Sequence, residues 1–251
     1  MIPALILITV LATSILSGAV GMAGGMILMA LLAWLLPVPT AMMLHGVTQA
    51  GANGSRAWFL KDHVQWRVLP PYLIGAALCV GLFATLTFVP ERGIVLVLVG
   101  LFPWAGRLLP APERLDALRP ESGLLCGFTV TAAQLLAGAS GPLLDIFFLR
   151  SALTRHEIVA TKAVTQTLGH LTKISYYGTL MILLGDGVPR SEFAPSLLFL
   201  AVVPIALLGT RIGTRLLDRF DEPGFRAASE HIILAIGAAC TISGAAELLR
   251  A

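Results

Sequence analysis

Two stretches of the sequence carry the same polar pattern: HGVTQAGANGSR, from His45 to Arg56, and KAVTQTLGHLTK, from Lys162 to Lys173. Each contains Val-Thr-Gln and ends in a basic residue, and the two start 117 positions apart. With 100° of rotation per helical residue, positions 45, 49, 53 and 56 fall within an arc of about 80°, and so do their counterparts. Each stretch therefore predicts a helix with one polar face.

The composition around these stretches is that of a membrane protein. The chain has 251 residues, of which 57% are hydrophobic and 12% are charged, with a mean hydropathy of +0.86. Soluble domains average about 25% charged residues. Apolar runs of membrane-spanning length occur at residues 3–36, 40–60, 68–89, 93–109, 122–153, 157–184, 193–210 and 228–249. We therefore expect an all-α integral membrane protein with no large water-soluble domain between the runs.

The first and fifth runs are too long for one crossing. Each holds about 32 residues and would measure about 48 Å as a single helix, against a hydrocarbon core of roughly 30 Å. Both contain helix breakers near the middle, GMAGGM at residues 21–26 and GASGP at residues 138–142. Glycine weakens a helix interior, and proline suits a first helical turn. We predict that each run is a broken helical hairpin that returns to the side it came from.

The distribution of basic residues favours these hairpins. Eight single crossings would divide the basic residues outside the runs equally between the two sides, which gives no orienting signal under the positive-inside rule. With two hairpins, the side without the termini collects Lys61, Arg67, Arg107, Arg114, Arg119, Arg150, Arg155, Arg211, Arg215, Arg219 and Arg226. The other side keeps Arg92, Arg190 and Arg250. We therefore expect both termini to be periplasmic in a bacterial inner membrane.

The hairpins divide the chain into two similar halves. We predict a first repeat at residues 1–109, a cytoplasmic linker at 110–121 and a second repeat at 122–251, each repeat a hairpin followed by three transmembrane helices. Because each repeat makes an odd number of net crossings, the second is inverted relative to the first, as in many secondary transporters. From Gly21 to Leu60 the halves align without a gap, which pairs His45 with Lys162, Gln49 with Gln166, Asn53 with His170, and Arg56 with Lys173.

An inverted repeat would bring the two polar faces together around one site. A basic residue at membrane depth costs at least about 2.5 to 3.5 kcal/mol, so it faces a cavity or a partner. The return arms of the hairpins add free backbone N–H groups at helix N-termini, which favour anions. We predict an anion site near the midplane, formed by Gly24, Gly25, His45, Thr48, Gln49, Asn53, Arg56, Ser140, Gly141, Lys162, Thr165, Gln166, His170 and Lys173.

Each of these residues also has a structural interpretation. The threonines and glutamines could join helices by hydrogen bonds, and the glycines could allow close helix packing. Arg56 and Lys173 could extend to the membrane surfaces, and the histidines could be satisfied core residues. Asp145, the only acid well inside a run, could pair with a cation or carry a coupled proton.

The glycine and polar motifs resemble those of a known family. GMAGGMILMALLAWL followed by the first polar stretch, and GASGPLLDIFFLR followed by IVATKAVTQ, resemble the TauE/SafE family of sulfite and organosulfonate permeases over nearly the whole chain. The resemblance implies transport of a small sulfur-containing anion, such as sulfite, a sulfonate or a sulfoacetate-like compound, through a bacterial inner membrane.

Three other functions compete with an alternating-access secondary transporter for a small sulfur-containing or organic anion. An anion channel would have the same lining. An integral membrane enzyme would need clustered acids, bases or metal ligands, and a metal transporter would need buried carboxylates or thiols; the sequence offers neither pattern. We expect no catalytic residue, no metal or cofactor, and no nucleic-acid partner. The expected partners are the small anion and the lipid bilayer, and a homo-oligomer is possible.

Overall fold

The computed structural model describes residues 2–20, 23–108, 115–149, 151–183, 196–217 and 222–250, and within them it is helical without a strand. The first half contains α1 (Ile2–Val20), α2 (Ala23–Leu35), α3 (Val38–Phe59), the short 3-10 helices η1 (Lys61–His63) and η2 (Trp66–Val68), α4 (Leu69–Leu86) and α5 (Arg92–Leu108). The second half contains α6 (Pro120–Ala137), α7 (Gly141–Phe148), α8 (Arg155–Leu183), α9 (Ser196–Leu217) and α10 (Glu222–Leu248). This agrees with the prediction of an all-α protein.

Both long apolar runs are interrupted where the glycines occur. The first divides between α1 and α2, although Gly21 and Met22 of the predicted break lie outside the described residues. The second divides between α6 and α7, where Gly138 has a positive φ of 72° and donates its N–H to the Gln134 carbonyl at 3.0 Å. Only glycine adopts this left-handed conformation readily. Pro142 then occupies the first turn of α7, where its missing N–H is not needed.

Helices from the two halves of the chain pack against each other. The most extensive pairs are α1 with α9, α5 with α10, α3 with α8, and α4 with α6. Glycines allow the closest approaches, because a methyl group on Gly127 would overlap the carbonyl oxygen of Tyr72 and one on Gly75 that of Leu124. Gly100 and Gly237 have the same role between α5 and α10. Small residues at helix contacts are typical of membrane bundles, where backbones approach closely.

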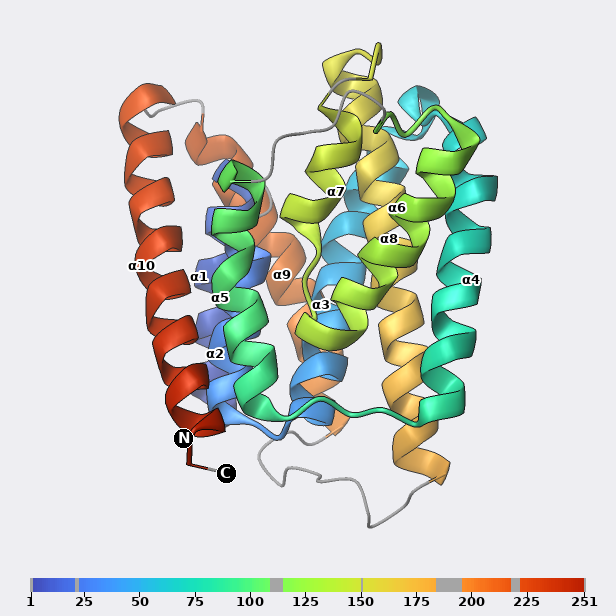
Figure 1. The fold of residues 1–251 in the computed structure, drawn as a ribbon. Helices are drawn as coiled ribbons and strands as arrows, with labels where there is room; N and C mark the ends of the chain where they lie inside the picture. The colour runs from blue at the N-terminus through green and yellow to red at the C-terminus, as the bar shows by residue number, and fades with distance from the viewer. Residues whose placement is uncertain are drawn as a thin grey trace.

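The arrangement of the helix ends defines two faces of the bundle. The N-terminus and the C-terminus lie at the same end, together with the connection between α4 and α5 (Figure 1). The short helices η1 and η2 and the start of α6 lie at the opposite end (Figure 1). The two hairpins therefore begin from opposite faces. Of the predicted loop cations, Arg114, Arg150, Arg190 and Arg219 lie outside the described residues, as do residues 110–114 of the predicted linker.

The outer surface of the bundle is apolar. On α4, Ile74, Leu78 and Leu86 are each more than half exposed, which is unfavourable in water and normal in lipid. Among the described helices, only the stretch Trp66–Leu86 is both long and apolar enough to count alone as a membrane span. Five shorter apolar helical stretches accompany it: Ile2–Ser17, Gly24–Leu35, Arg92–Trp104, Leu197–Gly213 and Ile233–Leu248.

Some helices extend beyond the apolar runs. We expected the eighth run to begin at residue 228 and the seventh to end at 210, whereas α9 continues to Leu217 and α10 begins at Glu222. Arg211 and Arg215 are good helix formers, so the helix continues after the apolar residues end. Conversely, α4 ends at Leu86 instead of residue 89, because Thr87 has a positive φ of 45°.

Two glycines of α4 provide a matched test of the helix packing. We expect Gly75→Ala to destabilise the protein by about 1–3 kcal/mol, because the added methyl group meets the Leu124 backbone. Gly81→Ala is the control, since no atom lies within 4 Å of the added carbon, and its better helix propensity should leave stability unchanged or raise it by up to about 1 kcal/mol. Thermal unfolding of the purified variants measures both; equal melting temperatures would contradict the packing.

Candidate functional site

The two polar stretches meet at one cavity inside the bundle. Its volume is about 30 Å³, and since a water molecule needs about 10–15 Å³ of such space, it holds roughly two or three water-sized groups. The lining comes from both hairpins and from the polar faces of α3 and α8, and consists of Ser17, Gly25, Met26, His45, Gln49, Asn53, Arg56, Gln134, Ala139, Ser140, Gly141, Gln166 and His170. The arrangement is therefore that of a small, partly open cavity with a largely polar lining between the halves of the chain.

Nine of the fourteen predicted site residues line this cavity: Gly25, His45, Gln49, Asn53, Arg56, Ser140, Gly141, Gln166 and His170. Gly24, Thr48, Lys162, Thr165 and Lys173 are absent from the lining. Gly24 instead lies against the backbone of Thr13 and Ser17, where a side chain would overlap α1. The hydroxyls of Thr48 and Thr165 donate within their own helices, to Leu44 at 2.8 Å and to Lys162 at 3.0 Å.

Lys173 lies behind the cavity and joins both hairpins through His45. Its Nζ donates to His45 Nδ1 at 2.8 Å and to the Gly138 carbonyl at 2.8 Å. On the other side of the imidazole, His45 Nε2 lies 2.8 Å from the Gly25 carbonyl oxygen. Because a carbonyl only accepts, Nε2 carries the hydrogen. The chain of hydrogen bonds therefore runs from α2 through α3 and α8 to the break of the second hairpin.

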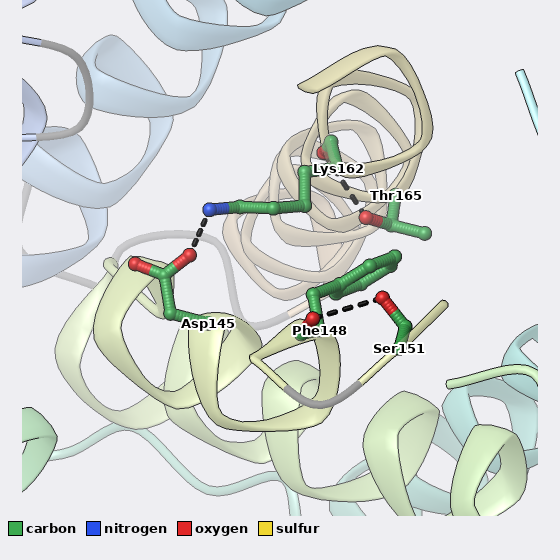
Figure 2. A network of polar contacts seen from close by, with 5 residues as sticks. All are labelled: Asp145, Phe148, Ser151, Lys162 and Thr165. Atoms are coloured by element: carbon green, nitrogen blue, oxygen red, sulfur yellow. Dashed lines mark hydrogen bonds and ion pairs between the residues drawn. The ribbon is translucent and has the colours of Figure 1, made fainter. Parts of the chain in front are cut away.

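Lys162 has a different environment from Lys173. Its Nζ forms an ion pair with Asp145 of α7, and Figure 2 shows the two side chains pointing toward each other. The side chains of Lys162 and Asp145 are 16% and 40% exposed, whereas Lys173 is 0% exposed. Of the two interpretations of Asp145, pairing with a cation is the one that the geometry matches. Lys162 is thus paired with a carboxylate, whereas Lys173 is fully buried and its hydrogen-bond partners in the described residues, His45 and the Gly138 carbonyl, include none.

Four lining residues were not predicted from the sequence, namely the apolar Met26 and Ala139 and the polar Ser17 and Gln134. Ser17 on α1 and Gln134 on α6 both contact the cavity, and they lie 117 positions apart. Extending the alignment of the halves by four residues, from Gly21 back to Ser17, would have found them. Gln134 Nε2 lies 3.4 Å from His170 Nδ1, while Gln134 Oε1 and Ser140 Oγ are buried without a partner in the described part of the protein. Buried groups of this kind are normally satisfied, which indicates room for a polar ligand.

The chemistry of the lining favours an anion. Arg56 supplies a guanidinium with five donors, and Gln49, Asn53 and Gln166 supply amide groups. None of the residues that line the cavity is a carboxylate. The N–H of Gly141, the first residue of α7, adds a further donor at the lining. A small oxyanion, which offers only acceptors and negative charge, would complement these groups.

The fold and this cavity define a helical bundle of membrane type with a polar cavity whose lining includes Arg56. Residues 5–240, nearly the whole chain, match the sulfite exporter TauE/SafE family, and the chain belongs to that family. No curated protein and no solved structure shows significant similarity to it. Because the family consists of membrane transporters, the protein is a multi-pass membrane transporter, in agreement with the family resemblance of its motifs.

Isosteric substitutions separate the cavity lining from residues that only bond within a helix. We expect Gln166→Leu to weaken anion binding by about 5–10-fold, which corresponds to one lost hydrogen bond of about 1–1.4 kcal/mol. Thr165→Val, one residue away, removes a hydroxyl that bonds to Lys162 of its own helix and should change affinity less than about twofold. Titration of the purified variants with sulfite compares them; equal losses would contradict the assignment of the lining.

Proposed function

We propose that the protein is a secondary transporter that moves a small sulfur-containing anion, sulfite or a small sulfonate, across the bacterial inner membrane by alternating access. The observation that carries the proposal is the cavity itself, where Arg56 and the amides of both polar stretches converge without a carboxylate in the lining. The small cavity volume of about 30 Å³ favours a compact anion over a bulky one. Family membership supports the sulfur chemistry.

An inverted repeat is part of this proposal, and the helix pairs support it. Matching the two halves in order relates α1 to α6, α3 to α8, α4 to α9 and α5 to α10. Under that exchange the pair α1 with α9 becomes α6 with α4, and both are among the most extensive pairs. The pairs α3 with α8 and α5 with α10 exchange with themselves. Such a pattern is typical of two inverted halves that can rock around a central site.

Transport by purified protein in liposomes tests the function. We expect saturable sulfite counterflow that falls at least about tenfold in Arg56→Gln, because the variant loses the guanidinium of the lining. Arg67→Gln is the control, since Arg67 is exposed on η2. The competing channel would give conductance without counterflow. Absence of any sulfite flux, or equal flux in both variants, would refute the proposed site.

We also propose that the face with the termini is periplasmic. The opposite face carries Lys61 and Arg67 in η1 and η2 and Arg155 at the start of α8, which fits the positive-inside rule. The face with the termini carries Arg92 at the start of α5, and Arg92 pairs with Glu247 at 2.9 Å.

Thiol labelling of intact cells tests this orientation. The native cysteines Cys79, Cys126 and Cys240 are buried, so their background labelling should be low. We expect Glu91→Cys, at an exposed position between α4 and α5, to react with a membrane-impermeant reagent. Asp62→Cys, exposed in η1, should react only after permeabilisation. The reverse result would invert the topology, and equal reactivity would contradict opposite faces.

A further inference from the structure

Lys173 differs from Arg56 in its position relative to the cavity. Lys173 is fully buried and absent from the cavity lining, whereas Arg56, its counterpart 117 positions earlier, lines the cavity. The two repeats thus carry two different cations at equivalent positions. An arginine stays charged in proteins, while a lysine amine can lose its proton when buried. The difference suggests a division of roles between a permanent charge and a titratable one.

The hydrogen bonds of Lys173 suit either protonation state. Nζ has two acceptors in the described structure, His45 Nδ1 and the Gly138 carbonyl. A neutral amine has two hydrogens and satisfies both. With one more proton, Lys173 is an ammonium beside a neutral imidazole, or the proton moves along the Nζ–Nδ1 bond and leaves an imidazolium beside a neutral amine. In every case the bond from His45 Nε2 to the Gly25 carbonyl remains. The network can therefore gain and lose one proton without breaking.

We infer that the Lys173–His45 pair is a proton-binding site linked to the anion cavity, so that the protein carries about one proton with each anion. The inference goes beyond the proposed function, on which it rests. His45 belongs both to the pair and to the lining, so a bound anion lies beside the proton site. A buried positive charge without a counterion is costly, and an adjacent anion offsets that cost. By linkage, the proton favours the anion to the same extent.

The surroundings of the pair contain no competing acid in the described structure. The titratable or charged groups that face it are His170 of α8, whose ring centre lies 5.4 Å from that of His45, and Arg56 of α3, which lines the same cavity. From α2, α6 and the break between α6 and α7 the neighbours are Gly25, Gln134, Gly138 and Ser140, none of which titrates. Lys162, the other lysine of α8, is already paired with Asp145.

Proton uptake measured during anion binding tests the inference. The probes are thiosulfate and isethionate, which carry no titratable proton near neutral pH, so a proton taken up must bind to the protein. In weakly buffered solution with a pH indicator, we expect about one proton taken up per anion bound by the wild type. Its affinity should fall by up to about tenfold per pH unit in the alkaline range.

Conservative variants identify the group that takes the proton. Lys173→Arg keeps a permanent charge, so it should bind the anion without proton uptake and with an affinity that changes less than about twofold with pH. Lys173→Met should also lose the uptake, and serves if the arginine does not fit. Lys61→Arg is the control, because Lys61 is exposed on η1, and it should behave like the wild type.

The outcomes separate this inference from the proposed function. Anion binding by the wild type without proton uptake would overturn the inference and leave the anion site intact. Proton uptake that persists in Lys173→Arg would also overturn it, because the proton would then bind elsewhere, for example at His170. If neither anion binds to the wild type, while sulfite also fails to bind, the proposed function falls together with the inference.

Discussion

The hydrogen-bond chain from the Gly25 carbonyl through His45 and Lys173 to the Gly138 carbonyl is the constraint on which the centre of this protein depends. Broken helices leave backbone groups without helical partners, and inside a membrane water cannot satisfy them. Here Lys173 of α8 bonds to the Gly138 carbonyl, which follows the end of α6, and His45 of α3 bonds to the Gly25 carbonyl in the first turn of α2. The same bonds hold the two long helices together and keep a cationic group at the centre. The hydrogen bonds of His45 and Lys173 therefore contribute both to the packing of α3 against α8 and to the polarity of the region around the cavity.

The glycines have two separate functions in this arrangement. Gly138 permits a left-handed turn that ends α6 and allows α7 to begin three residues later. Gly75 and Gly127 instead remove side chains where α4 and α6 touch backbone to backbone. The first use shapes the cavity, and the second assembles the frame around it. A substitution at either type of site acts on a different property, the site geometry or the stability of the bundle.

Much of the fold was predictable because it follows from length and periodicity. The excess length of two apolar runs predicted the breaks at Gly21–Met26 and Gly138–Pro142, and the 100° rotation per residue predicted which stripe residues share a face. The depth of each side chain was not predictable. Arg56 and Lys173 occupy equivalent positions, yet one lines the cavity and the other lies behind His45, because the neighbours contributed by distant helices differ. Thr48 and Thr165 lie next to the lining glutamines, but their hydroxyls bond to their own helices.

The position of Lys173 late in the chain also has a consequence for biosynthesis. A lysine near the centre of a helix is expensive to insert into a bilayer, at about 2.5–3.5 kcal/mol. Its partners, His45 and Gly138, both precede it in the sequence and have therefore already left the ribosome when α8 is synthesised. The segments synthesised earlier, α3 and the break after α6, can thus provide hydrogen-bond acceptors for the lysine as it enters the membrane. Insertion of α8 is thereby coupled to helices that precede it in the chain, since both hydrogen-bond partners of Lys173 are already in place when it arrives.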